Sequence, residues 1–362
     1  MKKHSKKAAA GSEPSRTVGL DLGDKFCHYC LLDGEGEVME EGRVKTEEGA
    51  LRKHFENEER MRVAMECGTH SPWISRLLAK LGHEVIVANA RKLKAVTQEE
   101  EVRNDRRDAE QLAPLALWSP KLLKGIQPRS AERQRDRTVI QARTTRVRAR
   151  TMIINATRGL VKSMGRRLPA CSAESFPNQA KPLLPAELAE LIGPMVHQGQ
   201  ALHQPIDKRE QQVEALVQRF PEIRTLRTVP GVGPLVAATY GRTLKGANVV
   251  PHSRSAGAFL GLGPRKKQSG DSDPQGKITR AGNPYLRSLL LPSAHYVLGH
   301  FGPDSALRRW GLKLAASGGK RGKKRALVAV ARKLAVILHR LWRTGESYPA
   351  FPQGQLAAPG QA

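Results

Sequence analysis

The stretch TVGLDLGDKFCHYCLLDGEGEVMEEGRVKT, residues 17–46, decides the fold of the first part of the chain. Apolar residues alternate with other residues in its opening segment, which is typical of a half-buried strand. A second apolar segment follows, and the Gly-rich turn DGEG separates it from a third segment. The stretch therefore predicts a meander of three strands. The first ends near Gly23, the second spans Phe26–Leu32 and the third spans about Glu37–Lys45.

The residues that follow alternate between helix and strand signals. They predict a helix over Glu47–Phe55, a short apolar strand over Arg62–Cys67, an amphipathic helix over Ser71–Leu81 and a buried strand over Glu84–Ala88. A further helical pattern comes next and contains the stretch VRNDRRDAEQ, residues 102–111. This order of elements predicts an α/β domain in which helices flank a mixed sheet.

Two carboxylates lie within the predicted strands of this domain. Asp21 lies between Leu20 and Leu22 and therefore faces away from that apolar pair, while Glu66 lies near the end of a later strand. Acidic residues are disfavoured inside strands, so the presence of Asp21 and Glu66 there requires a structural or functional explanation. The plain alternatives are that Asp21 caps a turn at the strand end and that Glu66 faces solvent.

A second pair of carboxylates, Asp105 and Asp108, opens the later helix. A spacing of three places both side chains on one helix face. The plain alternative is a solvated helix start, where acids favour the helix dipole. The other interpretation is half of a divalent-metal site, because a hard cation needs several converging carboxylate oxygens. If the strands of Asp21 and Glu66 are neighbours, these side chains converge with the aspartate pair.

The composition favours a polyanionic partner. The chain has 362 residues, with 61 Lys and Arg against 34 Asp and Glu, and a formal charge of +27. This length allows two or three domains, and the positive surplus predicts binding to nucleic acid. No run of eighteen apolar residues exists, so no membrane span is predicted. The basic residues 1–16 lack a following apolar core and predict a disordered arm rather than a secretory signal.

The cysteines predict a reducing compartment, the cytosol. Four cysteines in a chain of this length do not make a disulfide framework. Cys27 and Cys30 form a CHYC pair without a second pair at zinc-finger spacing. Because they lie in an apolar, strand-like run, we expect them to be buried rather than to bind metal.

After Pro128 the sequence becomes strongly basic and helical. Residues 129–167 hold twelve Lys or Arg and two acids, around an apolar stripe at intervals of seven or eight residues. A charge run is usually a solvated face, but this one has a single sign and no pairing acids, so we expect it to track phosphates. The arginines selected as DNA contacts are Arg143, Arg146, Arg148 and Arg150.

The middle of the chain predicts a pair of helices. A Pro-rich loop spans 169–185, and a second amphipathic helix ends near Phe220. Together with the basic helix it predicts an antiparallel helical hairpin or coiled coil, which could also serve as a dimerisation surface.

A turn with the sequence PGVGP opens the last part of the chain. Gly231 and Gly233 allow a tight turn and a close approach of the backbone, and Pro234 suits the first position of a helix. The turn resembles a helix-hairpin-helix element, whose exposed amides hold a phosphate. An ordinary turn between two helices is an equal alternative.

A polar, Gly-rich and basic loop follows at 264–282. Its cations Arg265, Lys266 and Lys267 can approach a phosphodiester. Ser269 and Ser272 lie in the same loop, and the residues alone indicate turn serines. A basic segment then leads into an amphipathic helix that ends near Trp342, and a Pro/Gly/Gln-rich tail completes the chain.

The first part of the chain resembles the RuvC-like (RNase H-like) domain of insertion-sequence transposases with an Asp-Glu-Asp-Asp tetrad. The pieces that carry the resemblance are VGLDLGDK, VAMECGTHSPW and RNDRRDAEQLA, over roughly residues 17–120. It implies that Asp21, Glu66, Asp105 and Asp108 bind a divalent metal, Mg²⁺ or Mn²⁺, at the DNA.

The pieces GLGPRKKQSG and GKITRAGNPYLRSLL resemble the C-terminal domain of the same family. In that family a serine of this loop is the nucleophile, and Ser269 best matches its position, with Ser272 as the alternative. The resemblance also implies a noncoding guide RNA that bridges target and donor DNA. We accordingly expect a homo-oligomer, either a dimer or a tetramer. We expect it to act in the bacterial cytoplasm, at the nucleoid.

We therefore predict a metal-dependent DNA recombinase with a serine nucleophile. One alternative is a junction-resolving nuclease that uses water as the nucleophile, and another is a non-enzymatic basic DNA-binding protein. The predicted domains are a basic arm (1–16), a RuvC-like metal domain (17–124), a helical hairpin (125–222), a mainly helical C-terminal transposase domain (223–345) and a disordered tail (346–362).

Overall fold

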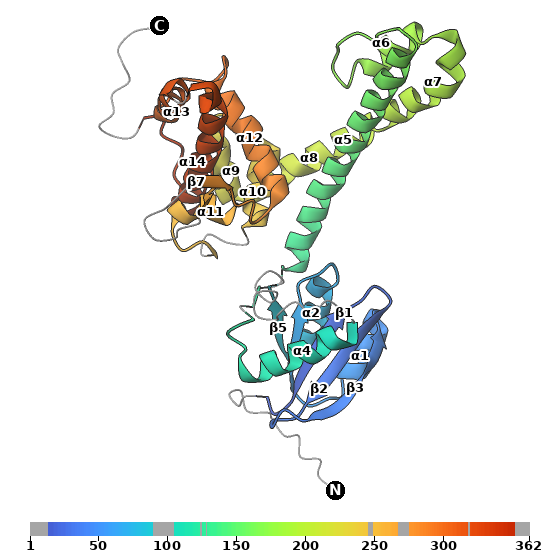
Figure 1. Ribbon diagram of the computed structural model, residues 1–362, viewed down its shortest axis with the longest axis vertical. Helices are drawn as coiled ribbons and strands as arrows, with labels where there is room; N and C mark the ends of the chain where they lie inside the picture. Colours follow the sequence, from blue (N-terminus) through green and yellow to red (C-terminus); the bar gives the residue numbers. More distant parts are fainter. Residues whose placement is uncertain are drawn as a thin grey trace. The chain divides into compact units, whose positions relative to one another are not determined.

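The computed structural model describes residues 14–89, 105–123, 125–127, 129–244, 249–266, 275–317 and 319–351. The chain divides into two compact units, Met1–Ala131 and Glu132–Ala362. The first unit is an α/β domain and the second is mainly helical, as the sequence predicts (Figure 1). None of the described helices combines the length and the apolar character that crossing a membrane requires.

The first unit is built on a mixed sheet with the strand order β3-β2-β1-β4-β5. Its strands are β1 (Thr17–Leu22), β2 (Phe26–Leu32), β3 (Val38–Lys45), β4 (Arg62–Glu66) and β5 (Glu84–Ala88). β1, β2 and β3 pair antiparallel, whereas β4 runs parallel to both β1 and β5. The predicted meander and the two later strands are confirmed, with bounds that differ from the prediction by about one residue.

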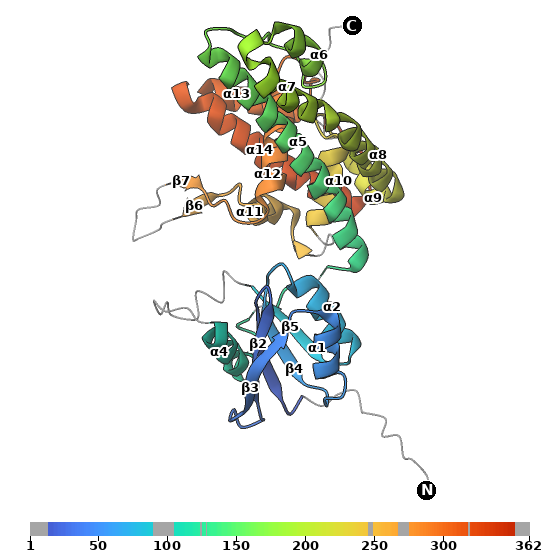
Figure 2. The ribbon, with the colours of Figure 1, turned by 90° about the vertical axis from the view of Figure 1, so that its right-hand side faces the viewer.

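Helices cover both faces of this sheet (Figure 2). They are α1 (Glu48–Phe55), α2 (Ser71–Lys80) and α4 (Asp105–Trp118). α1 and α2 pack on one face, where Leu20, Met65 and Ile74 are fully buried in a common core. α4 packs on the other face, where Ala64 and Leu112 are buried together. The small alanine side chains on this face allow the helix to approach the strands closely.

Gly19 of β1 marks the closest approach between this helix and the sheet. A Cβ atom at this position would overlap the Ala109 carbonyl oxygen and would lie 2.7 Å from the Ala113 nitrogen. Both are backbone atoms of α4, so a small rotamer change cannot relieve the overlap. Gly19 therefore fixes how closely α4 can lie against β1.

Gly19→Ala is expected to lower the free energy of unfolding of the first unit by about 1–3 kcal/mol, because the methyl group must push α4 away from β1. Denaturant unfolding followed by circular dichroism measures this change. The matched control is Gly49→Ala in α1, where an added Cβ meets nothing within 4 Å. If both variants unfold at the same denaturant concentration, the close approach at Gly19 does not limit stability.

In its described residues, the second unit consists of helices and one small hairpin of strands. Its longer helices are α5 (Ala131–Ser163), α7 (Ala186–Ala201), α8 (His203–Arg219), α10 (Pro234–Thr243), α12 (Pro284–Leu298), α13 (Ala306–Ser317) and α14 (Gly322–Thr344). The short elements are α6 (Phe176–Ala180), α9 (Pro221–Thr225), α11 (Ala256–Phe259), β6 (Pro264–Lys266), β7 (Gln275–Ile278) and single 3₁₀ turns such as Leu226–Thr228. α14 is the predicted amphipathic helix, and its apolar face, including Val330, Leu334 and Leu338, is fully buried.

α7 and α8 return antiparallel to α5. Gly199 lies beside Ile153, Glu210 pairs with Arg143 at 2.7 Å, and Arg219 pairs with Asp136 at 2.6 Å. The partner positions rise along one helix as they fall along the other, which is the signature of an antiparallel pair. The predicted antiparallel pairing is thus observed, while a coiled coil in the strict sense stays a prediction.

Two apolar cores stabilise this unit. The larger one joins the start of α5 and the end of α8, through Ile140 and Val217, to the helices from α9 to α14. A smaller, separate core lies at the far end of α5, where Ile154 and Val161 pack against Phe176 and Val196. The long helix therefore connects two independently packed regions.

Several segments differ from the sequence prediction. The Pro-rich segment 169–185 contains α6 and a 3₁₀ turn, because Phe176 and Ala180 pack into the smaller core. The loop 264–282 contains the paired strands β6 and β7. The tail contacts the rest of the second unit at Tyr348, whose amide donates to Thr228 Oγ1 at 2.9 Å. Most of the predicted arm 1–16 and the tail beyond Phe351 lie outside the described residues.

Candidate functional site

The direction of α4 relative to the strands determines which residues meet at the edge of the first unit. Arg62, the first residue of β4, donates from Nη1 to the Ala116 carbonyl oxygen at 3.2 Å. Thr17, the first residue of β1, pairs with Arg62 in the sheet. The last turn of α4 therefore lies over the first residues of β1 and β4. The first turn of α4, with Asp105 and Asp108, accordingly points toward the strand ends that carry Asp21 and Glu66.

Asp21 and Glu66 lie on neighbouring strands at the same level. The parallel register pairs Gly19 with Ala64 and then Leu20 with Met65, so Asp21 and Glu66 are the next residues in line. Neighbouring strands are roughly 4.8 Å apart. Because side chains alternate between faces, Asp21 and Glu66 share the face of Gly19 and Ala64, which α4 covers. The fold thus brings these two acids to one strand end, under the start of α4.

Asp108 is half-buried in the first turn of α4, and the structure describes Asp105 only through its helical backbone. Within the described part of the chain, no group of three or more His, Cys, Asp or Glu is close enough to hold a metal. The donor set nevertheless fits a hard cation, since Asp21, Glu66 and Asp108 offer only carboxylate oxygens. The metal role of the four acids stays a prediction.

Two histidines lie at the same edge, and the sequence patterns did not single them out. His28 of β2 is the antiparallel partner of Asp21 and therefore shares its face. Its Nδ1 atom is buried without a hydrogen-bond partner among the described residues. His70, which follows β4, accepts from Trp73 Nε1 at 3.1 Å and lies 3.6 Å from the Asp24 carboxylate. Only the strand register could have revealed His28, because its own sequence context is an ordinary strand.

The CHYC pair is buried, as predicted, and all four cysteines are free. Cys27 and Cys30 lie on opposite faces of β2, one in the core under α1 and α2 and the other under α4. A metal ion cannot bind both of them from opposite sides of a strand. Burial raises the pKa of the Cys27 thiol, which further disfavours the thiolate form that metals require.

The four selected arginines of α5 differ in their surroundings. Arg143 pairs with Glu210, and the buried Arg150 pairs with Glu174 at 3.0 Å. The expectation of an arginine face without pairing acids was therefore wrong, because acids from outside the helix reach it. Arg146 is half-buried and Arg148 is exposed. Arg148 is the member of the set best exposed for a phosphate contact.

Replacing Arg143, Arg146, Arg148 and Arg150 together with glutamine is expected to flatten the plot of log affinity for DNA against log salt. Each lost phosphate contact lowers the slope by about 0.9 on duplex DNA. Titrations at several salt concentrations measure it. The single variant Arg148→Gln should produce most of this change in slope, and Arg150→Gln should change the slope little. An unchanged slope in the fourfold variant would remove this helix from the binding surface.

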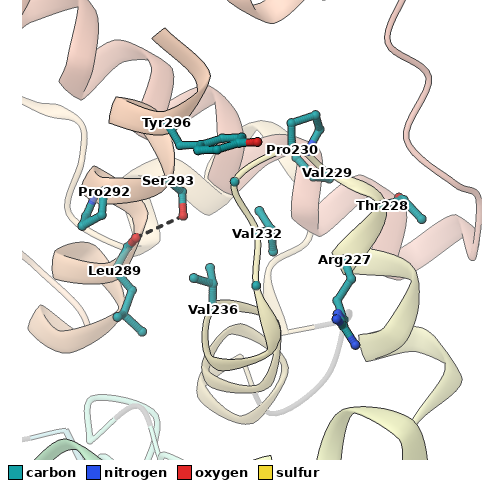
Figure 3. Close-up of a pocket in the computed structure, with 12 residues that line it drawn as sticks. Arg227, Thr228, Val229, Pro230, Val232, Val236, Leu289, Pro292, Ser293 and Tyr296 are labelled. Carbon is teal, nitrogen blue, oxygen red and sulfur yellow. Dashed lines mark hydrogen bonds between the residues drawn. The ribbon is translucent and has the colours of Figure 1, made fainter. Parts of the chain in front are cut away.

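The PGVGP turn lies beside an open cavity of about 480 Å³, lined by both arms of the turn and by α12 (Figure 3). Gly231 has φ +78°, and a Cβ there would meet the Ser293 carbonyl oxygen at 2.9 Å, so only glycine fits. The Tyr296 ring lies across the turn near Pro230 (Figure 3). The backbone of this turn is therefore held against α12 at a fixed distance.

The start of α10 leaves backbone donors available at this turn. Gly233 is the N-cap and provides no side-chain hydrogen bond, and an added Cβ there would meet nothing within 4 Å. The first amides of a helix have no partner within the helix, and they carry partial positive charge. These features suit an anion, although the helix-hairpin-helix assignment itself stays a prediction.

The basic loop that carries the predicted nucleophile is framed by β6 and β7. Arg265 is exposed, and Lys266 ends β6. Lys267, Ser269 and Ser272 lie outside the described residues. The antiparallel pairing of Pro264 with Ile278 and of Lys266 with Gln275 brings the two ends of this segment together.

Comparisons with known proteins match two regions of the chain. Residues 18–165 match a family model described as a transposase, and residues 223–309 match one described as a transposase of the IS116/IS110/IS902 family. A transposase for the insertion sequence element IS1111A of Coxiella burnetii is 26% identical over 356 residues, which is 95% of this chain and 94% of that protein. A probable family 20 transposase of Pseudomonas aeruginosa is 29% identical over 289 residues, 78% of this chain and 83% of that protein.

Proposed function

We propose that this chain, which belongs to the IS110/IS116 family of insertion-sequence transposases, exchanges DNA strands through a metal-dependent reaction with a serine nucleophile. As a transposase, it acts on DNA by phosphoryl transfer. The observation that carries the proposal is the edge of the first unit, where α4 begins over the ends of β1 and β4. The strand order and the mixed pairing also support the RNase H-like assignment of this unit.

Asp21, Glu66, Asp105 and Asp108 hold the metal in this proposal. When bound, a divalent cation neutralises charge on the scissile phosphate and polarises its oxygen. The start of α4 suits negative side chains, because a helix N-terminus carries partial positive charge. The protein's own contribution is thus a set of negative oxygens held by two strands and one helix.

Ser269 is the proposed nucleophile. Its Oγ forms a bond to phosphorus as one bond from phosphorus to a sugar oxygen breaks. The serine proton passes to a base, and the departing sugar oxygen takes up a proton to become a free hydroxyl end. A serine hydroxyl is weak at neutral pH, and cations of the same sequence loop, Arg265 and Lys267, would favour its deprotonated form. The phosphoserine conserves the phosphodiester bond energy, so a sugar hydroxyl of another strand can displace the serine without net hydrolysis.

Removing divalent metal tests the first part of this proposal. With a chelator present, we expect DNA cleavage to cease while DNA binding persists, because binding depends on the basic surface. Added Mg²⁺ or Mn²⁺ should restore cleavage. Cleavage that continues at full rate with a chelator would contradict a metal role for the acids, and loss of binding in the chelator would show that metal supports binding as well.

We further propose that the protein uses a noncoding guide RNA that bridges target and donor DNA. The charge of +27 is compatible with bound RNA. Sequencing the nucleic acid that co-purifies with the protein should return one RNA species in preference to bulk cellular RNA. We also propose a dimer or tetramer acting at the nucleoid, which light scattering of the purified protein can measure.

A junction-resolving nuclease that uses water as its nucleophile is the remaining alternative. It shares the carboxylates but needs no serine, so a covalent protein–DNA adduct separates the two mechanisms. The similarity to transposases over most of the chain disfavours the second alternative, a non-enzymatic DNA-binding protein.

A further inference from the structure

A polar cavity of about 190 Å³ lies within the second unit and shares no lining residue with the cavity at the PGVGP turn. It is enclosed by α5, by the second half of α10 and by the start of α12. Arg137 and Arg148 of α5 and Thr239 and Arg242 of α10 are among the side chains that line it. Its lining includes no acid, so its walls offer mainly cations and hydroxyl groups.

Two of the lining groups are buried without partners. Thr239 is 3% exposed, and its Oγ1 has no hydrogen-bond partner within the described residues. Arg242 is 5% exposed, and its Nη2 lacks a partner within the same residues. Buried polar groups are almost always hydrogen-bonded, because an unpaired buried group loses its hydration free energy without gaining a hydrogen bond in return. Both residues line the same cavity, so a ligand bound there would supply the missing partners.

The positive charge of Arg242 is only partly compensated. Its Nε lies 3.1 Å from Asp136 Oδ2, close enough for an ion pair but poorly aligned for a hydrogen bond. Asp136 also pairs with Arg219, so one carboxylate serves two guanidinium groups. Burial lowers the pKa of Arg242, and the Asp136 charge opposes that effect. The face of the guanidinium lies against the Phe220 ring at 3.6 Å, which leaves its edge for an acceptor.

Two further arginines, Arg137 and Arg148, line the cavity, and hydrogen bonds between the surrounding helices hold its walls in place. Arg148 lies 5.8 Å from the centre of the Tyr285 ring, and the Tyr285 hydroxyl lies 2.5 Å from Thr144 Oγ1. Asn283 caps the start of α12 and donates to Thr243 Oγ1 at 3.1 Å. No carboxylate in the described ranges forms an ion pair with Arg137 or Arg148. The walls are thus held in place while the two arginines remain available.

We propose that this cavity binds one phosphate group of a nucleic-acid backbone. Arg242 and Thr239 form its floor, and Arg137 and Arg148 close over the phosphate from the rim. Guanidinium groups suit this ligand because their planar donors match two phosphate oxygens. The inference rests on the proposed function only in taking nucleic acid as the partner. It adds a fixed phosphate position between α5 and α10, where the sequence predicted only a diffuse basic face.

Binding measurements on the full-length protein test the site without relying on strand cleavage. The probes are inorganic phosphate, followed by thermal shift, and a fluorescent DNA duplex and a fluorescent RNA hairpin of equal phosphate number. Thr239→Val preserves side-chain volume and removes an unpaired hydroxyl, so a purely structural role predicts equal or higher thermal stability and unchanged binding. The phosphate site predicts roughly tenfold weaker binding with the fold intact.

Arg137→Gln provides the second variant and Arg135→Gln its matched control. Both arginines lie on α5, but Arg135 is exposed and is not part of the cavity lining. We expect Arg137→Gln to weaken nucleic-acid binding several-fold more than Arg135→Gln and to remove the thermal stabilisation by phosphate. A selective loss with DNA or with RNA identifies which backbone the cavity holds, and either one supports the site. Equal effects of the two arginine variants, or unchanged binding by Thr239→Val, would overturn it.

Discussion

Glu66→Gln is expected to abolish DNA strand cleavage while leaving the fold and DNA binding unchanged. The substitution keeps the volume of the side chain and removes its charge, so the expected effect is loss of metal affinity at the end of β4. Losing even a group that only orients a metal ligand typically lowers affinity or activity 10–100-fold, so losing a ligand should exceed about 100-fold. Asp21→Asn, Asp105→Asn and Asp108→Asn should each have the same effect. A cleavage assay in Mg²⁺, with a parallel binding assay, measures both quantities.

Asp24→Asn is the matched control for these four variants. Asp24 follows β1 closely, but its side chain is 97% exposed and lies beyond the strand. It should therefore retain near wild-type cleavage. If one of the four variants recombines DNA at the wild-type rate in Mg²⁺, that residue is not a metal ligand. If Asp24→Asn also loses cleavage, the effect reflects the local negative charge rather than a defined set of ligands.

Ser269→Ala is expected to eliminate the covalent protein–DNA adduct. A suicide DNA substrate that releases one product strand should trap the wild-type protein as a phosphoserine, and the mass shift should map to the peptide holding Ser269. Removing a nucleophile removes the covalent step itself, so no residual adduct is expected. The acids remain in place, so metal and DNA binding should be retained.

Ser272→Ala is the control, because it lies in the same loop and should preserve the adduct. The opposite pattern would transfer the nucleophile role to Ser272. Wild-type protein that cleaves in Mg²⁺ but never forms an adduct would favour the nuclease that uses water. These outcomes are independent of the phosphate cavity, whose test measures binding alone.

The fold of the first unit could be predicted closely because its signals are local. The alternation around Leu20, the turn after Leu32 and the apolar run at Glu84–Ala88 each specify one element. The second unit was harder. α7 is missing from the prediction because Gly and Pro interrupt its pattern, and the segment around Phe176 forms a helix only because its side chains pack into a core. Tertiary packing there overrides the local turn signals.

The candidate site could be predicted only in part, for a similar reason. Asp21 and Glu66 stand out in sequence because acids are unusual within strands. His28 does not stand out, since only the register of β2 against β1 places it beside Asp21. The partners of the α5 arginines are also remote, with Glu210 lying 67 residues from Arg143. Contacts of this kind are set by the return of a distant helix, which no local pattern encodes.

The length of α5 also sets the distance between the nucleic-acid positions that its two ends could contact. Its 33 residues, at about 1.5 Å per residue, span roughly 50 Å from Ala131 to Ser163. Along a B-form duplex, with a rise of about 3.4 Å per base pair, this distance corresponds to roughly 15 base pairs. Because α5 joins two separate apolar cores, the spacing between them is set by helix geometry and cannot adjust freely. A B-form duplex contacted at both ends of α5 would therefore present backbone positions about one and a half turns apart.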